Sequence, residues 1–145
     1  MDAVDRKILK ILQENARNSV TYISKAIGMS DDAVKYRISK MEKLGVIRGY
    51  KPVLDLEMLG LEETVLVNVK LGGHSTEEKL RFVAFLKEES NIVSVMETAG
   101  ECDFVLLFRL QDKKEFCALQ DKIRDNFSEL ITEWTATVAV KNWKD

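Results

Sequence analysis

Two short helical patterns separated by a glycine turn restrict the possible folds more than any other feature of this 145-residue chain. Residues 20–27 repeat apolar side chains at helical spacing, and residues 31–44 do the same. Between them, Gly28 suits the left-handed backbone that ends a helix, and Ser30 suits the N-cap of the next helix. This arrangement predicts a helix-turn-helix, whose second helix lies in the major groove of DNA.

The predicted second helix divides its side chains between an apolar stripe and a polar face. We expect the stripe to be buried, and its members are Val34, Ile38, Met41 and Leu44. The opposite face carries cations and hydrogen-bonding groups suited to base edges and phosphates. We predict that it presents four residues to the groove, namely Lys35, Tyr36, Ser39 and Lys40. Further candidates for phosphate contacts are Arg17, Lys25, Arg48 and Lys51.

Three charged residues of this helix have two interpretations each. Arg37 flanks the stripe, so it either joins the DNA contacts or braces the domain. Asp31 and Asp32 suit the positive end of the helix dipole, yet DNA phosphates would repel them. They therefore either face away from the duplex or accept a hydrogen bond from cytosine.

The charge distribution supports DNA binding by the first part of the chain. Residues 1–50 hold 10 Lys and Arg against 6 Asp and Glu, a net charge of +4. Residues 51–145 hold 12 against 18, a net charge of −6, so the total of −2 conceals a cationic part suited to phosphates. Lysines on a helix are usually only solubilising, and it is their coincidence with the turn that indicates DNA.

The sequence divides into two domains joined by a connector. An amphipathic helix beginning at Asp2 completes a three-helix core, and residues 45–51 predict a short strand and turn that form a wing. Residues 1–50 are therefore expected to form a winged helix-turn-helix domain. Apolar side chains in residues 51–63 predict a packed connector, and residues 64–145 form the second domain.

The second domain alternates strands with helices. Strands are predicted over residues 65–71, 92–99, 104–110 and 131–140, with helices that start after Ser75 and Asp112. The order βαββαβ is that of a ferredoxin-like sandwich, so the fold class is α+β. Two helices cover only one face of such a sheet, while Leu66, Val105 and Leu107 place apolar groups on the other. We therefore expect a homodimer in which the open faces meet.

Several segments together resemble the Lrp/AsnC family of transcription regulators, over essentially the whole chain. In the first domain these are DAVDRKILKILQENAR, which ends at the Arg17 signature, GMS at residues 28–30, and YRISKMEKLGVIRGY at residues 36–50. In the second domain AGECDF at residues 99–104 is similar to the Gly-x-x-Asp loop of the family, and VAVK at residues 138–141 to its closing strand.

The resemblance implies a sequence-specific DNA-binding dimer that often assembles into octamers or tetramers. It also implies a small-molecule effector, commonly an amino acid, whose site in this sequence comprises Gly100, Cys102 and Asp103. Asp103 would accept from an α-ammonium, and backbone N–H groups near Gly100 would receive a carboxylate. In the alternative interpretation Gly100 only supplies a turn and Asp103 only bonds its backbone. Cys102 stands where relatives often have an aromatic residue, which leaves the effector undefined.

The composition predicts a cytoplasmic protein without a membrane partner. No apolar stretch approaches the roughly 20 residues that span a bilayer, and the start MDAVDRK lacks a secretory signal. Cys102 and Cys117 lack the spacing of metal ligands. We expect no metal site, no cofactor and no catalytic residue.

Two other functions compete with regulation of transcription. Some tetrapyrrole-modifying decarboxylases resemble this family in fold, but they require acid–base side chains, and the single histidine, His74, lies in a predicted turn. The other competitor is a ligand sensor that no longer binds DNA. Such a sensor would not require the cations Lys35 and Lys40, and we rank it lowest.

Overall fold

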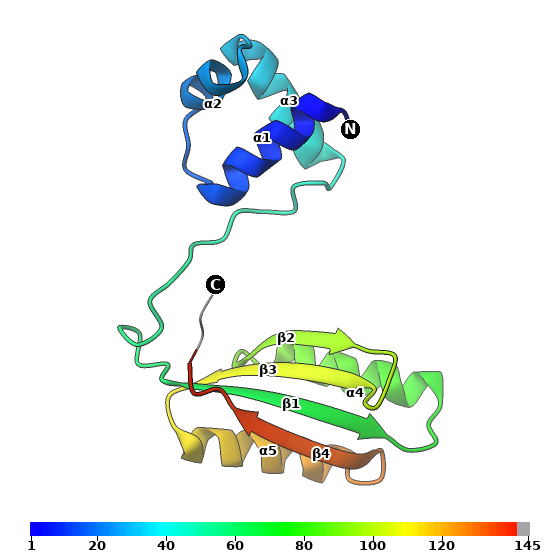
Figure 1. Ribbon diagram of the computed structural model, residues 1–145. Helices are drawn as coiled ribbons and strands as arrows, with labels where there is room; N and C mark the ends of the chain where they lie inside the picture. Colours follow the sequence, from blue (N-terminus) through cyan, green and yellow to red (C-terminus); the bar gives the residue numbers. More distant parts are fainter. Residues whose placement is uncertain (142–145) are drawn as a thin grey trace. The chain divides into compact units, whose positions relative to one another are not determined.

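The computed structural model describes residues 1–141 and divides the chain into two compact units, which we call unit 1 (residues 1–53) and unit 2 (from residue 54 onward). Unit 1 is helical, and unit 2 combines a sheet with two helices (Figure 1). Within the described residues no helix is long and apolar enough to cross a membrane.

Unit 1 is built from three helices that enclose one core. They are α1 (Ala3–Glu14), α2 (Val20–Ile27) and α3 (Asp31–Lys43). The predicted caps are confirmed: the Ser19 hydroxyl accepts from the N–H of Tyr22, and the Ser30 hydroxyl accepts from the N–H of Ala33. Gly28 ends α2 with a φ of 71°, a left-handed conformation that glycine adopts at little cost. The buried core comprises Ile8, Leu12, Ile23, Val34 and Met41, which confirms the helix-turn-helix prediction.

Two details at the end of α3 differ from the prediction. Leu44, expected in the buried stripe, is 68% exposed because it caps the helix. Residues 45–51 form turns and extended coil where we predicted a strand. Their backbone donors end the helix, since the N–H groups of Val46 and Ile47 both bond the carbonyl of Met41. Among the described residues of unit 1 there is also no strand to pair with a wing strand.

The connector is exposed in the single chain, so the prediction of a packed connector was wrong. Val53 and Met58 are 83% and 85% exposed. Local hydrogen bonds shape this segment instead: the Asp55 carboxylate accepts from the N–H of Met58, and the turn ends at Gly60, whose φ is 70°. Backbone capping, and not burial of apolar side chains, determines its conformation.

Unit 2 has the βαββαβ order that the sequence predicts. Its strands are β1 (Glu63–Leu71), β2 (Ile92–Glu97), β3 (Phe104–Leu110) and β4 (Ile131–Val138). They form an antiparallel sheet in the order β2-β3-β1-β4. The helix α4 (Thr76–Glu88) follows β1, and α5 (Lys113–Phe127) follows β3. Both helices begin at predicted caps, Ser75 and Asp112, while β2 and β4 end two residues before the predicted limits.

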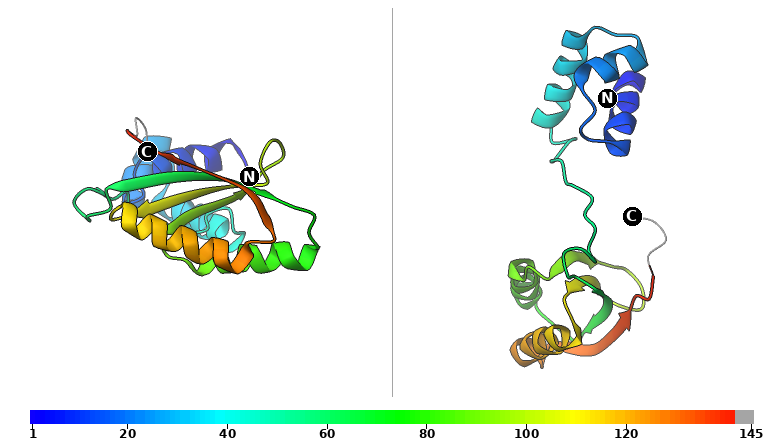
Figure 2. Two further views of the ribbon diagram at one scale, coloured as in Figure 1. Left: turned by 90° about the horizontal axis from the view of Figure 1, so that it is seen from below. Right: turned by 90° about the vertical axis from the view of Figure 1, so that its left-hand side faces the viewer.

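Both helices cover the same face of the sheet, as Figure 2 shows. Phe82 of α4 and Phe104 and Phe108 of β3 are almost fully buried in the layer between them. The uncovered side, which we call the open face, has Leu66 opposite Leu107 in the register of β1 and β3. Leu66 is 38% exposed and Leu107 is half-buried, so the middle of the open face is apolar and lacks a cover within the described chain.

Candidate nucleic-acid interface

The predicted DNA-binding side chains of α3 lie on one exposed face. Lys35, Tyr36 and Lys40 are exposed, with Tyr36 at 68%, and Ser39 is half-buried beside them. Because an α-helix completes a turn in 3.6 residues, positions three and four apart are neighbours on its surface. We call these four residues the recognition face. It presents ammonium and hydroxyl groups together, the chemistry that contacts phosphates and base edges.

The acid at the first position of α3 is turned toward α2. Asp31 accepts hydrogen bonds from the hydroxyl of Ser24 and, at 2.7 Å, from the hydroxyl of Thr21. The bonds from Ser24 and then Thr21 hold the pKa of the Asp31 carboxyl below its usual value. Asp31 therefore links the two helices of the turn. Asp32 remains exposed, and its carboxylate lies 3.9 Å from the ammonium of Lys35.

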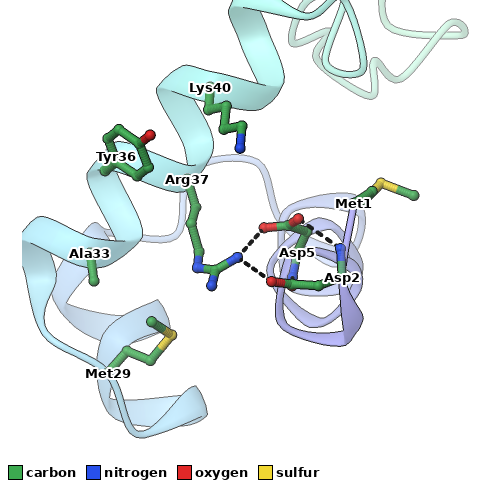
Figure 3. A pocket seen from close by; sticks show the side chains of 8 residues that line it. All are labelled: Met1, Asp2, Asp5, Met29, Ala33, Tyr36, Arg37 and Lys40. Atoms are coloured by element: carbon green, nitrogen blue, oxygen red, sulfur yellow. Dashed lines mark hydrogen bonds and ion pairs between the residues drawn. The ribbon is translucent and has the colours of Figure 1, made fainter.

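Arg37 braces α3 against the first turn of α1. Its Nη1 donates to Oδ2 of Asp2 and to Oδ1 of Asp5, each at 2.7 Å (Figure 3). The two aspartates also cap each other's backbone N–H groups at the start of α1. These backbone bonds, followed by the bond from Arg37, lower the pKa of both carboxyls. Of the two interpretations of Arg37, the structure supports the brace.

A shallow hollow lies where this brace meets the recognition face. Figure 3 shows the residues that line it, which are Met1, Asp2, Asp5, Met29, Ala33, Tyr36, Arg37 and Lys40. Arg37 points toward the aspartates, whereas Tyr36 and Lys40 rise from the same stretch of α3 on either side of it. Two carboxylates and two members of the recognition face therefore share one hollow.

The predicted phosphate contacts are exposed at the ends of helices and beyond them. They are Arg17 after α1, Lys25 on α2, and Arg48 and Lys51 after α3. Over residues 1–141 the structure shows no ion pair to any of these four. The segment after α3 is held by Tyr50, whose hydroxyl donates to Glu42 at 2.9 Å.

In unit 2 the predicted effector loop is tied to the end of β1. The Asp103 carboxylate accepts from the N–H of Leu71 at 2.7 Å. The Thr98 hydroxyl donates to the carbonyl of Cys102 at 2.6 Å, and Cys102 is half-buried. Gly100 is exposed, with open space where a Cβ would stand. One oxygen of Asp103 thus has a partner within the chain, and the backbone at Gly100 is accessible to a small molecule.

The remaining candidate groups do not converge on a common site. His74 is exposed, and its Nδ1 lies 2.6 Å from the carbonyl of Gly72 in the same turn. Cys117 is exposed on α5. In the part of the chain that the structure describes, no group of three or more His, Cys, Asp and Glu side chains is placed to hold a metal ion.

Sequence reasoning missed the partners of the acidic residues. Asp2 and Asp5 are spaced as a capping pair, and this local signal was available in the sequence. The bond of Asp31 to Ser24 and the reach of Asp103 to Leu71 had no comparable signal, because each joins elements that become neighbours only on folding.

Comparison with known sequences places both units in described families. Residues 1–48 match the winged helix-turn-helix DNA-binding family, and residues 64–145 match the Lrp/AsnC ligand binding domain. The HTH-type transcriptional regulator FL11 of Pyrococcus horikoshii is 32% identical over 133 residues, which cover 90% of this chain and 80% of the relative. The DNA-binding transcriptional activator DecR of Escherichia coli is 29% identical over 116 residues, which cover 80% and 76%.

Solved structures agree with this assignment. An AsnC family transcriptional regulator from Agrobacterium tumefaciens superposes with a TM-score of 0.92 at 30% identity, over 100% of this chain and 94% of that one. A transcriptional regulator of Neisseria meningitidis, solved as a complex with L-Met, shares the fold with a TM-score of 0.86 at 22% identity, over 100% and 93%. The chain therefore belongs to the Lrp/AsnC family and is a DNA-binding transcriptional regulator of that type.

Proposed function

We propose that this regulator recognises specific DNA sequences with the recognition face of α3. The observation that carries the proposal is the sorting of charge on this helix: Lys35 and Lys40 are exposed beside Tyr36, whereas Asp31 is bonded to α2. A helix that turns its first acid inward and its cations outward suits a polyanion in a groove. Arg17, Lys25, Arg48 and Lys51 would add phosphate contacts around it.

We further propose that residues 1–50 bind DNA and that residues 64–145 mediate oligomerisation and bind the effector. The open face supports the second role, because its apolar middle at Leu66 and Leu107 is uncovered in the described chain. Burying such a surface against a second copy removes it from water. We therefore expect a homodimer, which can assemble further into tetramers or octamers. Since DNA is its ligand, we place its action in the cytoplasm.

The loop from Gly100 to Asp103 is our proposed site for an amino-acid effector. Support comes from the accessible backbone at Gly100, the half-buried carboxylate of Asp103, and the L-Met complex of the related fold. Asp103 retains acceptor capacity beyond its bond to Leu71, because a carboxylate has about four lone-pair directions. An effector at this loop would act by binding alternative assemblies with different affinity.

We propose regulation by binding and not by catalysis. Membership of a family of transcriptional regulators supports this proposal. Addition of haem or sirohaem to the purified protein should produce no specific Soret shift, and DNA retardation should be observed. A reproducible shift with turnover would favour the tetrapyrrole-decarboxylase alternative.

A footprint of the purified full chain on genomic DNA tests the proposed function. A dimeric reader should protect paired half-sites about one helical turn, roughly 10 base pairs, or a multiple of it apart. Binding without any preferred sequence at physiological salt would contradict sequence-specific recognition.

A further inference from the structure

The bond between Arg37 and the start of α1 lies at the edge of the recognition face. Arg37 follows Tyr36 directly and precedes Lys40 by one helical turn, and all three line the same hollow as Asp2 and Asp5. A change in the position of Arg37 would therefore shift Tyr36 and Lys40, which lie on either side of it. A charged contact between two helices of the domain therefore lies beside the side chains that we assign to DNA binding.

Two polar ties join α3 to the other two helices of unit 1, and they differ from the apolar packing beneath it. Asp31 ties the first residue of the helix to α2, and Arg37 ties its middle to α1 through Asp2 and Asp5. Apolar contacts are non-directional, whereas charge-assisted bonds from a planar guanidinium fix geometry. With one tie near its start and one near its middle, the two sets of bonds together favour one rotation and tilt of the helix.

Arg37 also offsets part of the negative charge of the two acids that it bonds. The Asp5 side chain is 14% exposed and that of Asp2 is 54% exposed, and both line the hollow together with Lys40. Without the guanidinium, their negative charge would act on any phosphate that approaches Lys40. Arg37 thus weakens a repulsive field at the edge of the recognition face while holding the helix.

We propose that Arg37 is a positioning residue for DNA recognition, and that its bonds to Asp2 and Asp5 set the orientation in which Tyr36 meets the bases and Lys40 meets the phosphates. The proposal rests on the assignment of the recognition face to the major groove. It predicts a specific signature: loss of the brace lowers the preference for the correct sequence more than it lowers general affinity for DNA. A residue needed only for stability would not change that preference in the folded protein.

The experiment compares binding of the full chain to two duplexes of equal length and composition. One carries the sequence that the wild type selects from a random library, and the other carries the same bases in scrambled order. Asp5→Asn keeps the shape of the side chain but removes the charge that Arg37 bonds. Glu14→Gln is the matched control, because it removes the same charge from an exposed position at the other end of α1.

For Asp5→Asn we expect the ratio of specific to scrambled affinity to fall about tenfold, a loss comparable to one base contact. Affinity for the scrambled duplex should hold or rise, because the domain loses a negative charge. Glu14→Gln should leave the ratio unchanged. Arg37→Met should lower affinity for both duplexes and lower the ratio, and Arg37→Lys should restore part of the ratio. Circular dichroism confirms that each variant is folded.

A ratio equal to that of the wild type in folded Asp5→Asn and Arg37→Lys would overturn the proposal, even if both variants melt earlier. Arg37 would then serve stability alone. The proposed function fails by a different result, in which the wild type itself shows no preference between the two duplexes. If Arg37→Met does not fold, Asp5→Asn and Arg37→Lys still decide the question.

Discussion

The guanidinium of Arg37 on α3 lies 2.7 Å from the carboxylate of Asp5 on α1, although the two residues are 32 positions apart in the sequence. This contact distinguishes Arg37 from the neighbouring cations of α3. Lys35 and Lys40 are exposed, while Arg37 has 27% of its side chain exposed and bonds two acids. A cation on a DNA-binding helix is therefore assigned to DNA only after its partners within the domain are known.

The carboxylate of Asp31 should make the stability of unit 1 dependent on pH. Hydrogen bonds from Ser24 and Thr21 lower its pKa in the folded protein from an ordinary value of 3.8. A carboxyl whose pKa is lower in the folded than in the unfolded protein stabilises the fold. This contribution is complete above the pKa of the unfolded protein and is lost as pH falls through the pKa of the folded protein. We expect Asp31→Asn to lower the melting temperature near neutral pH, with a difference that shrinks below about pH 4.

Thermal unfolding followed by far-UV circular dichroism at neutral pH and at about pH 2.5 checks this prediction. Asp32→Asn is the matched control, since Asp32 is exposed on the same helix turn and its ion pair with Lys35 spans 3.9 Å. It should change the melting temperature little at either pH. An Asp31→Asn difference of the same size at both pH values would contradict the assigned role of the charge.

The open face of unit 2 should hold the dimer together. Leu107→Asp places a charge in its middle, opposite Leu66, and burying an unpaired carboxylate is strongly unfavourable. We expect this variant to sediment as a monomer at micromolar concentration, while Leu80→Asp, on the exposed side of α4, remains associated. Dissociation of both variants, or of neither, would assign the dimer contact to another surface.

Asp103 allows its structural and ligand-binding roles to be separated. Asp103→Asn retains an oxygen that accepts from the N–H of Leu71 but removes the charge that would bind an α-ammonium. We expect its melting temperature to stay near that of the wild type, and its affinity for the effector amino acid to fall by about 2–5 kcal/mol if that ion pair is buried. Asp103→Ala should lose both properties.

Calorimetric titration of the common amino acids against the three proteins is the measurement. Binding by the wild type alone supports the proposed site. Equal binding by the wild type and Asp103→Asn would leave Asp103 with its bond to Leu71 as its only role. If none of the amino acids binds the wild type, amino acids are excluded as the class of effector.

Lys40 should contact phosphate and not a base. Lys40→Ala should then weaken binding to all sequences alike and reduce the slope of log affinity against log salt by about 0.9. Lys87→Ala removes the same charge from an exposed position on α4 and should leave the slope unchanged. If Lys40→Ala loses affinity for the preferred sequence alone, at an unchanged slope, Lys40 contacts a base.

Sequence patterns predicted what depends on near neighbours along the chain. The caps at Ser30, Ser75 and Asp112 each use a backbone N–H three residues ahead, so composition and spacing located them. Periodicity placed Leu44 in the core because it cannot detect that the backbone turns after Lys43. In the same way, the apolar side chains of the connector predicted packing, although Val53 and Met58 are exposed.

Contacts between distant segments were beyond the reach of these patterns. The sequence left Arg37 between two roles because nothing local to it names Asp2 or Asp5 as a partner. The same holds for Asp103, whose carboxylate reaches Leu71 only after β1 and the loop are brought together by the sheet. For charged residues near the proposed sites, the structure therefore adds most, because it identifies their bonding partners.

Photo-crosslinking tests most directly whether the recognition face touches the bases. A benzophenone side chain is placed at Tyr36, which is 68% exposed and already aromatic, and at Leu80 on α4 as a control with similar exposure. Each protein is irradiated on the duplex that the wild type protects in a footprint. We predict adducts from position 36 with bases inside the protected half-sites and none from position 80. A position-36 protein that binds the duplex fully yet forms no adduct with it would contradict the account.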